Sequence, residues 1–324
     1  MRYFVTGGAG FIGSNYVRGL LSGSWESHVT SVTVFDAFTY AGNPANLAEY
    51  ASDPRLTVVK GDIRDAADID RALPGHDLVV HFAAESHVDR SIEASSIFVT
   101  TNVLGAQQML EGAMRHNVET FVHVSTDEVY GSIAEGSWDE QEPLLPNSPY
   151  AASKASSDLL ARSYARTYGL DVRITRCSNN FGTHQFPEKV IPLFVTNLID
   201  GKKVPLYGDG LNIRDWLHVD DHCRGIQLVV DGGKSGEIYN IGGGTELTNR
   251  ELTTLILKAF DHGEEMVLPV ADRLGHDRRY SVDWSKINRE LGYSPTKSLE
   301  NSLDDVIAWY RNNEAWWRPL KANK

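Results

Sequence analysis

Two side chains near the middle of the chain have the spacing of a proton-transfer pair. Tyr150 and Lys154 follow Ser148 and Pro149, which suit the N-cap and the first position of a helix that presents both side chains on one face. A phenol has an ordinary pKa of roughly 10, and a neighbouring ammonium together with an oxidised nicotinamide would favour its phenolate. We therefore expect Tyr150 to take a proton from a substrate hydroxyl while a hydride leaves the same carbon.

A second reactive stretch follows the strand-like run at residues 121–124. Thr126, Asp127 and Glu128 bring one hydroxyl and two adjacent carboxylates to the carboxyl edge of a predicted sheet, where doubly wound sheets bind ligands. Oxidation of a hydroxyl to a ketone acidifies the neighbouring C–H, and a hydroxyl β to that ketone can then leave as water. This elimination needs a base and an acid, and two carboxylates in different surroundings can divide those roles.

A glycine-rich turn near the N-terminus predicts a dinucleotide site. Gly7, Gly10 and Gly13 are spaced GxxGxxG between a strand-like run and a helix, and Gly8, Gly10 and Gly13 also satisfy GxGxxG. Glycine lets the backbone approach a pyrophosphate, whose charge then meets free N–H groups at the helix N-terminus. Asp36 ends the next run, where a carboxylate accepts hydrogen bonds from ribose hydroxyls and repels a 2′-phosphate. The cofactor is therefore predicted to be NAD rather than NADP.

Alternating strand and helix patterns must position these groups. Short apolar runs alternate with helical stretches in the first half, which predicts an α/β fold with a Rossmann-type, doubly wound parallel sheet. The runs lie at residues 3–6, 32–35, 56–59, 78–82, 121–124 and 172–175. Beyond residue 176, loops rich in Gly, Asn and Pro separate helical patterns near residues 189–200, 219–230, 249–260 and 303–311. We predict an NAD-binding domain at 1–176 and a smaller α/β substrate lobe at 177–324, with the chain re-entering the first domain.

The bulk composition excludes several classes of protein. The 324 residues carry a formal charge of −12, which argues against nucleic-acid binding and requires a local basic cluster for any anionic substrate. No apolar run reaches the roughly 18 to 20 residues of a membrane span, and the N-terminus shows no signal-peptide pattern, so no membrane contact and a cytoplasmic location are expected. Cys177 and Cys223 lack the spacing of a disulfide framework or metal site, and no metal is predicted.

These motifs resemble those of the dTDP-glucose 4,6-dehydratases, a family of extended short-chain dehydrogenases. The resemblance runs over nearly the whole chain, including residues 39–42, 61–63, 83–90, 176–182, 185–192, 212–221 and 275–280. It implies a lyase in which Tyr150, assisted by Thr126, removes the C4 hydroxyl proton of the sugar. It further implies that Glu128 takes the C5 proton and that Asp127 protonates the departing C6 oxygen. Hydride return to C6 would regenerate NAD and give the 4-keto-6-deoxy sugar nucleotide.

The resemblance also implies the binding residues. Beside the glycines, Asp36, Tyr150 and Lys154, the cofactor would contact Phe11, Ile12, Thr39, Gly42, Asp62, Ile63, Ala83, Ala84, Thr101 and Asn180. Beside Thr126, the substrate dTDP-glucose would contact Ser86, Arg90, Asn179, Lys189, Val190, Pro205, Leu206, Tyr207, Arg214, Asn249, Arg273, His276 and Tyr280. Lys189, Arg214, Arg273 and His276 would supply the expected basic cluster. The chain departs from the family at Leu274, where proline is usual. A homodimer is expected through helices near residues 94–116 and 150–168.

Two other functions would use the same cofactor site. A nucleotide-sugar 4-epimerase would also employ Tyr150, but it would return hydride to C4 and would not need the pair Asp127 and Glu128. Epimerases similar to this chain carry small or uncharged residues at those two positions. A non-catalytic NAD-binding regulator could share the fold, although the presence of Tyr150, Lys154 and Thr126 argues against it.

Overall fold

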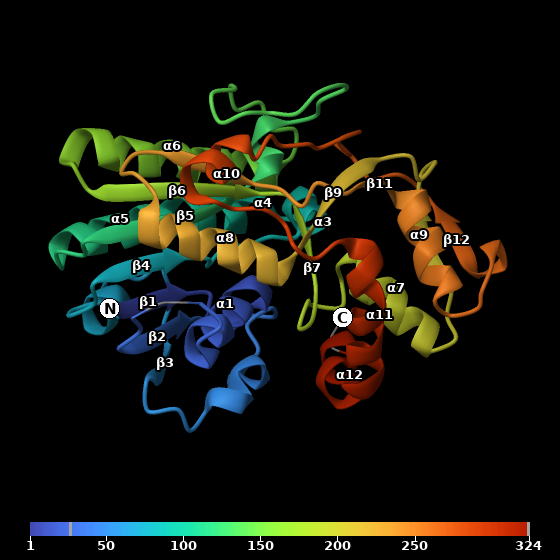
Figure 1. Cartoon of the computed structure of the whole chain (residues 1–324), viewed down its shortest axis with the longest axis horizontal. Coiled ribbons are helices and arrows are strands. Elements are labelled where there is room, and N and C mark those ends of the chain that lie inside the picture. The colour runs from blue at the N-terminus through green and yellow to red at the C-terminus, as the bar shows by residue number, and fades with distance from the viewer. Residues whose placement is uncertain (26–27, 323–324) are drawn as a thin grey trace.

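A parallel sheet forms the larger of two lobes in the computed structural model, which describes residues 1–25 and 28–322 (Figure 1). Its seven strands lie in the order β10-β6-β5-β4-β1-β2-β3, and every pair is parallel. The strands are β1 (Arg2–Thr6), β2 (Ser31–Asp36), β3 (Leu56–Lys60), β4 (Leu78–His81), β5 (Thr120–Thr126), β6 (Asp171–Cys177) and β10 (Ile238–Ile241). The predicted doubly wound sheet is confirmed.

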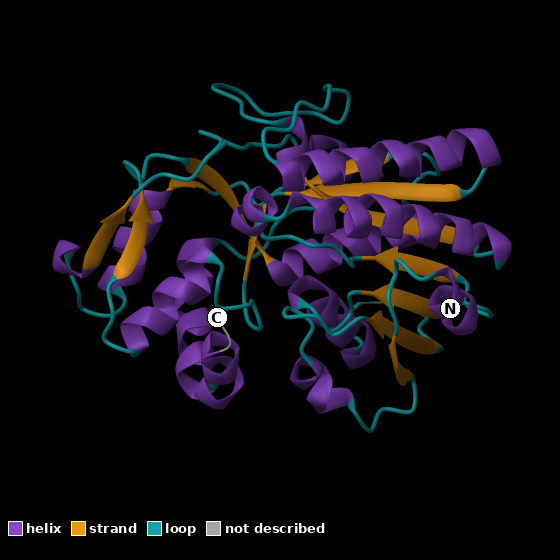
Figure 2. Ribbon diagram, turned by 180° about the vertical axis from the view of Figure 1, so that it is seen from behind, coloured by secondary structure: helices purple, strands orange, loops and turns teal. Residues whose placement is uncertain are grey.

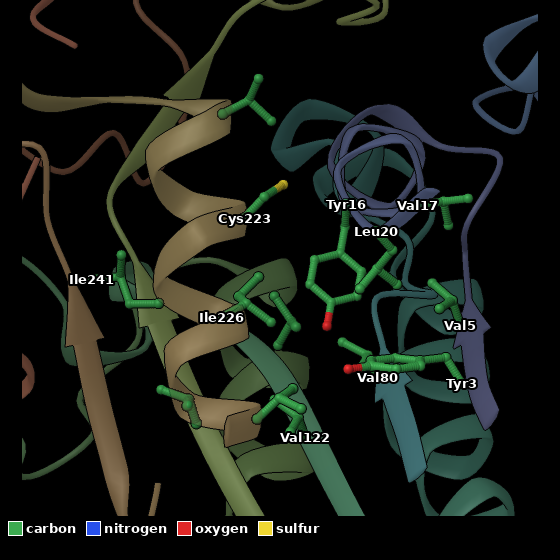
Figure 3. Packing of buried hydrophobic residues seen from close by; sticks show 14 of the residues in the cluster. Tyr3, Val5, Tyr16, Val17, Leu20, Val80, Val122, Cys223, Ile226 and Ile241 are labelled. Carbon is green, nitrogen blue, oxygen red and sulfur yellow. The ribbon is translucent and has the colours of Figure 1, made fainter. Parts of the chain in front are cut away.

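Helices cover both faces of this sheet because alternate strand residues point in opposite directions. In β1, Tyr3 and Val5 pack with Tyr16 and Ile226 in one buried cluster (Figure 3), whereas Phe4 belongs to a second cluster. Helices α1 (Phe11–Ser22) and α8 (Val219–Gly232) cover the first face, and α2 (Ala66–Ala72), α5 (Ala106–Arg115) and α6 (Pro149–Tyr168) cover the second. Each fully buried side chain of this size contributes roughly 1.5–3 kcal/mol, so the strand ends are held firmly.

The smaller lobe contains the chain's C-terminal helices and lies beside the carboxyl ends of the large sheet's strands (Figure 2). It comprises α7 (Val190–Ile199), β8 (Val204–Tyr207), α9 (Asn249–Lys258), β12 (Val267–Val270), α11 (Leu299–Asn312) and α12 (Glu314–Ala322). A short sheet of β11 (Glu246–Thr248), β9 (Ile213–His218) and β7 (Asn179–Phe181) joins it to the larger lobe. Because α8 and β10 pack in the larger lobe, the chain crosses between lobes more than once. The predicted boundary at residue 176 remains a prediction.

The helix predicted near residues 94–116 is interrupted. It consists of α4 (Ser95–Phe98), a π-helical segment η2 (Val99–Gly105) and α5. Gly105 lies so close to Ile63 that a Cβ at this position would approach the Ile63 side chain to 2.7 Å. Wider π turns often occur at functional sites, and Thr101 within η2 lines the cavity described below.

Three further expectations concern features of the whole chain. Within residues 1–25 and 28–322, no helix is long and apolar enough to cross a membrane. The same residues contain no cluster of three or more His, Cys, Asp or Glu side chains that could hold a metal ion. Cys177 and Cys223 are buried and not bonded to each other.

Candidate active site

One cavity of about 360 Å³ opens at the carboxyl ends of the parallel strands. The loops after β1 to β6 all contribute to its wall, as expected for a doubly wound sheet. Every residue that the sequence analysis assigned to the cofactor lies on this wall, together with Ser86, Thr126, Asp127, Glu128, Asn179 and Lys189. Residues far apart in sequence therefore meet in one chamber, which has the size expected of a small-molecule site.

The glycine turn is shaped so that only a bare backbone fits. Gly7 has a φ of +67°, and a Cβ there would lie 2.7 Å from the Ala83 nitrogen. A Cβ on Gly13 would lie 2.3 Å from the Gly7 carbonyl oxygen. Helix α1 starts directly after Gly10, and no side chain caps its N-terminus. Its first N–H groups can therefore bind the pyrophosphate of a dinucleotide, so these residues fit NAD.

Gly13→Ala should weaken NAD binding by roughly tenfold or more, because the added methyl group displaces the Gly7 carbonyl and the turn around it. Calorimetric titration with NAD measures this effect. Gly23→Ala is the control: Gly23 ends the same helix with a φ of +73°, so alanine strains the backbone there as well, but a Cβ at this position has no described atom within 4 Å and lies outside the turn. Equal NAD affinities of the two variants would show that the turn does not hold the cofactor.

Asp36 has a structural role in addition to the predicted one. Its Oδ2 accepts a hydrogen bond from the Ala9 N–H at 3.0 Å, and its Oδ1 accepts one from the Phe38 N–H at 2.8 Å. Burial raises the pKa of Asp36, while these two hydrogen bonds lower it. Each carboxylate oxygen can accept more than one hydrogen bond, so Asp36 can order the turn and still receive ribose hydroxyls from the cavity.

Helix α6 delivers Tyr150 and Lys154 to the cavity. It starts as predicted, because the Ser148 hydroxyl accepts a hydrogen bond from the Ala151 N–H at 3.1 Å and Pro149 occupies the first turn. The Lys154 ammonium donates to the Val124 carbonyl at 2.9 Å. The helix therefore fixes the lysine against the end of β5, beside the phenol.

The electrostatics of Tyr150 differ from the expectation that its neighbours favour a phenolate. Burial raises its pKa well above the ordinary value, and the charges of Glu128 and Asp127 act in the same direction. A hydrogen bond with Thr126 lowers the Tyr150 pKa, and the assisting role of Thr126 remains a prediction. Burial likewise lowers the pKa of Lys154. Desolvation is the largest cause of both pKa shifts because both side chains lie deep in the protein.

One residue near this pair was missed in the sequence. Asp158 follows Lys154 by one helical turn, is fully buried, and pairs with Arg176 of β6 at 2.8 Å. Burial alone would raise the Asp158 pKa, but Arg176 and several hydrogen bonds lower it to about 2. Its negative charge raises the pKa of Lys154 against the effect of burial. The spacing Tyr-xxx-Lys-xxx-Asp was the signal that could have revealed it.

The two adjacent carboxyl groups have different surroundings. Strand β5 ends at Thr126, whose hydroxyl accepts the Glu128 N–H and donates to Asp127 Oδ1, both at 3.3 Å. Asp127 is only 2% exposed, and its Oδ2 has no hydrogen-bond partner among the described residues. Burial raises the pKa of Asp127 well above its usual range, and the charges of Glu128 and Asp215 raise it further. The surroundings of Asp127 thus favour its protonated form.

Glu128 lies among positive charges. Burial raises its pKa too, but Arg273, Arg214 and Lys189 lower it. The two environments therefore push the pKa values of Asp127 and Glu128 apart, which is the pattern of an acid and base pair. Tyr280 lies beneath the Arg214 guanidinium, 4.3 Å from the ring centroid, and its hydroxyl is 3.5 Å from Glu128 Oε2. Three of the four predicted basic side chains thus act on Glu128.

The other predicted substrate residues lie beyond the cavity wall. Arg90 pairs with Glu188 at 3.1 Å, and His276 pairs with Asp272 at 2.6 Å. Val190 begins α7, Asn249 begins α9, and Pro205, Leu206 and Tyr207 lie in β8. Leu274, the departure from the family pattern, is 75% exposed. Their roles toward substrate remain predictions.

Comparisons with known proteins match this arrangement. The family model described as GDP-mannose 4,6 dehydratase matches residues 4–306. A dTDP-glucose 4,6-dehydratase of Streptomyces antibioticus is 61% identical over 99% of this chain and 96% of its own length. The chain belongs to the dTDP-glucose 4,6-dehydratase family. The predicted resemblance is confirmed.

Solved structures extend this comparison. The dTDP-glucose 4,6-dehydratase DesIV from Streptomyces venezuelae, determined with NAD and TYD bound, is 62% identical with a TM-score of 0.98, covering 99% of this chain and all of that one. A UDP-glucose 4-epimerase from Thermotoga maritima, determined with UDP-glucose, is 30% identical with a TM-score of 0.88, covering 97% of this chain and all of that one. The fold is thus shared with epimerases, and the choice between activities depends on side chains.

Proposed function

We propose that this protein is an NAD-dependent dTDP-glucose 4,6-dehydratase, a hydro-lyase that forms dTDP-4-keto-6-deoxyglucose. The observation that carries the proposal is the pair Asp127 and Glu128, two carboxyl groups in different environments beside Tyr150. An epimerase has no step that requires a base and an acid at this place. The relatives named for this activity, at 57–61% identity over nearly the full chain, support the same substrate.

The glycine turn, Asp36 and the cavity wall hold NAD in this proposal. When bound, NAD would supply the redox chemistry, namely acceptance of a hydride from C4 of the sugar and its return to C6. Tyr150 reacts as its phenolate, which the positive charge of bound oxidised nicotinamide would favour against the effect of burial, and takes the C4 hydroxyl proton at its phenolic oxygen, with the Thr126 hydroxyl bonded to it. Lys154, one helical turn after Tyr150, stays fixed against the Val124 carbonyl.

Elimination then proceeds between C5 and C6 of the 4-keto sugar. Glu128 takes the C5 proton, and Asp127 gives its proton to the C6 oxygen, so the C6–O bond breaks and water leaves. A proton returns from Glu128 to C5 as the hydride reaches C6. Tyr150 ends the cycle with one proton more and Asp127 with one fewer, and exchange with solvent restores both. The sum is loss of one water with no net oxidation.

Product analysis tests this proposal. Mass spectrometry should show that dTDP-glucose loses one water in the presence of catalytic NAD and no added reductant. An unchanged mass with conversion to the galactose isomer would make the protein an epimerase. Tight NAD binding without turnover of any nucleotide sugar would instead favour the regulator. The predicted cytoplasmic location is a separate expectation and remains a prediction.

A homodimer is also part of the proposal. Helices η2 and α6 expose apolar side chains on one face, with Val99, Leu104 and Leu159 each at least 44% exposed. A shallow hollow between the helices is lined by Val99, Thr100, Val103, Leu104, Gln107, Leu160 and Tyr164. A contiguous apolar face suits a self-complementary contact with a second copy.

Leu104→Glu should convert the dimer to a monomer at micromolar concentration, because it buries a charge in that face. Light scattering measures the mass, and circular dichroism checks that the fold is kept. Leu268→Glu on β12 is the matched control, since Leu268 is 48% exposed in the other lobe. A monomeric mass for the unaltered protein would refute the dimer.

A further inference from the structure

We propose that Asp277 is a positioning residue for Glu128. Asp277 accepts the one hydrogen bond that the Tyr280 hydroxyl can donate, so the Tyr280 oxygen offers only lone pairs to Glu128. Those lone pairs stabilise the Glu128 side chain once it has gained a proton. The inference rests on the proposed function, in which Glu128 is the C5 base. Neither the sequence motifs nor the family resemblance assigned a role to Asp277.

The hydrogen-bond lengths determine where the phenolic proton lies. The Tyr280 hydroxyl is 2.6 Å from Asp277 Oδ2 and 3.5 Å from Glu128 Oε2. A length of 2.6 Å is that of an O–H group bound to a carboxylate, whereas 3.5 Å is beyond the usual range. A phenol has only one proton to donate in a hydrogen bond, and Tyr280 donates it to the nearer carboxylate, that of Asp277. An ionised Glu128 therefore gains no donor from Tyr280, but a protonated Glu128 gains an acceptor.

The surroundings hold Asp277 in this geometry. Asp277 is 5% exposed and Tyr280 is 2% exposed. The Asn147 amide nitrogen donates to Asp277 Oδ1 at 2.5 Å, and the Asp277 carbonyl accepts from Asn212 at 3.1 Å and from Arg214 at 2.9 Å. Both carboxylate oxygens of Asp277 are thus engaged, each with a different partner.

Charged side chains from several elements face Glu128. Most of them lower the Glu128 pKa, whereas the charge of Asp277 raises it. Positive charges come from Arg214 of β9, Arg273 after β12 and Lys189 before α7, and they lower the Glu128 pKa against burial, while Asp277 raises it. The other titratable neighbours are Asp127, Tyr150 and Tyr280. The pKa of Glu128 is raised, with burial as the largest cause, and the three cations reduce that rise, whereas a general base needs a pKa near the working pH. The Tyr280 and Asp277 pair offsets this reduction.

Asp277→Asn should reverse the hydrogen bond at Tyr280. Asn147 continues to require an oxygen at Oδ1, so the new amide nitrogen takes the place of Oδ2 and donates to the phenol. The phenolic proton then turns to Glu128 and stabilises its carboxylate. The rate of C5 deuterium uptake from heavy water should be measured as a function of pH, and the acid limb of that profile should move to lower pH by about one unit. The plateau rate should fall several-fold because the base is weaker, while formation of the reduced nicotinamide is unchanged.

The decisive comparison uses Tyr280→Phe. If Asp277 acts through the phenol, Tyr280→Phe should shift the acid limb of the pH profile by less than Asp277→Asn does. In a protein that already carries Tyr280→Phe, Asp277→Asn should then cause no further shift. An equal shift by Asp277→Asn with and without the phenol would show a direct charge effect and overturn the inference, as would an unmoved limb in Tyr280→Phe. Asp209→Asn, an exposed acid-to-amide change, is the control. Failure of the unaltered protein to exchange C5 or release water would instead overturn the proposed function.

Discussion

Glu128→Gln should arrest the reaction after C4 oxidation. Glutamine keeps the size of the side chain but cannot take the C5 proton, and loss of a general base costs about 10²–10⁴-fold in rate. The reduced nicotinamide should therefore form in the presence of dTDP-glucose and persist, which its absorbance in stopped flow would record. Deuterium uptake at C5 from heavy water should slow by the same factor as release of water.

The control for this variant is Glu142→Gln, which alters an exposed glutamate in the loop between β5 and α6. Its rates of oxidation, C5 exchange and water release should match those of the unaltered protein. C5 exchange at the normal rate in Glu128→Gln would show that another residue is the base.

Asp127→Asn should impair loss of water more than any other step. Burial and the charges of Glu128 and Asp215 raise the pKa of Asp127, which favours the protonated form that donates to the C6 oxygen, and asparagine cannot supply that proton. We expect release of water to fall by about 10²–10³-fold. Glu128 remains intact in this variant, so oxidation at C4 and exchange at C5 should continue.

The two variants thus predict opposite results at C5, since exchange persists without Asp127 and stops without Glu128. Mass spectrometry after incubation in heavy water reads both in one experiment. Equal loss of oxidation and of water release in Asp127→Asn would contradict the assignment of this side chain as the acid.

Local patterns in the sequence were sufficient to predict the sheet and the glycine turn that follows its first strand. The strands at residues 3–6 and 32–35 are continuous apolar runs, and the glycine turn between sheet and helix is set by neighbouring residues. The start of α6 follows from Ser148 and Pro149, whose conformational preferences act over one turn. These features depend on short stretches of chain, and a single sequence contains all of the information that they need.

Features that depend on distant contacts could not be predicted. Asn147 bonds to Asp277 across 130 positions, and Tyr280 approaches Glu128 across 152, which no local pattern reports. The raised pKa of Tyr150 is a second case, because it results from burial, and burial depends on the complete fold. The strand order of the sheet and the π-helical turn of η2 are likewise consequences of packing.

The proposed reaction is tested most sharply with dTDP-glucose that carries deuterium at C4. The product should have lost one water and carry the deuterium on C6, with no net formation of reduced nicotinamide, because the hydride removed from C4 returns within the same turnover. Deuterium that remains at C4 of a nucleotide sugar of unchanged mass would contradict it, because the enzyme would then have returned the hydride to its origin and eliminated nothing.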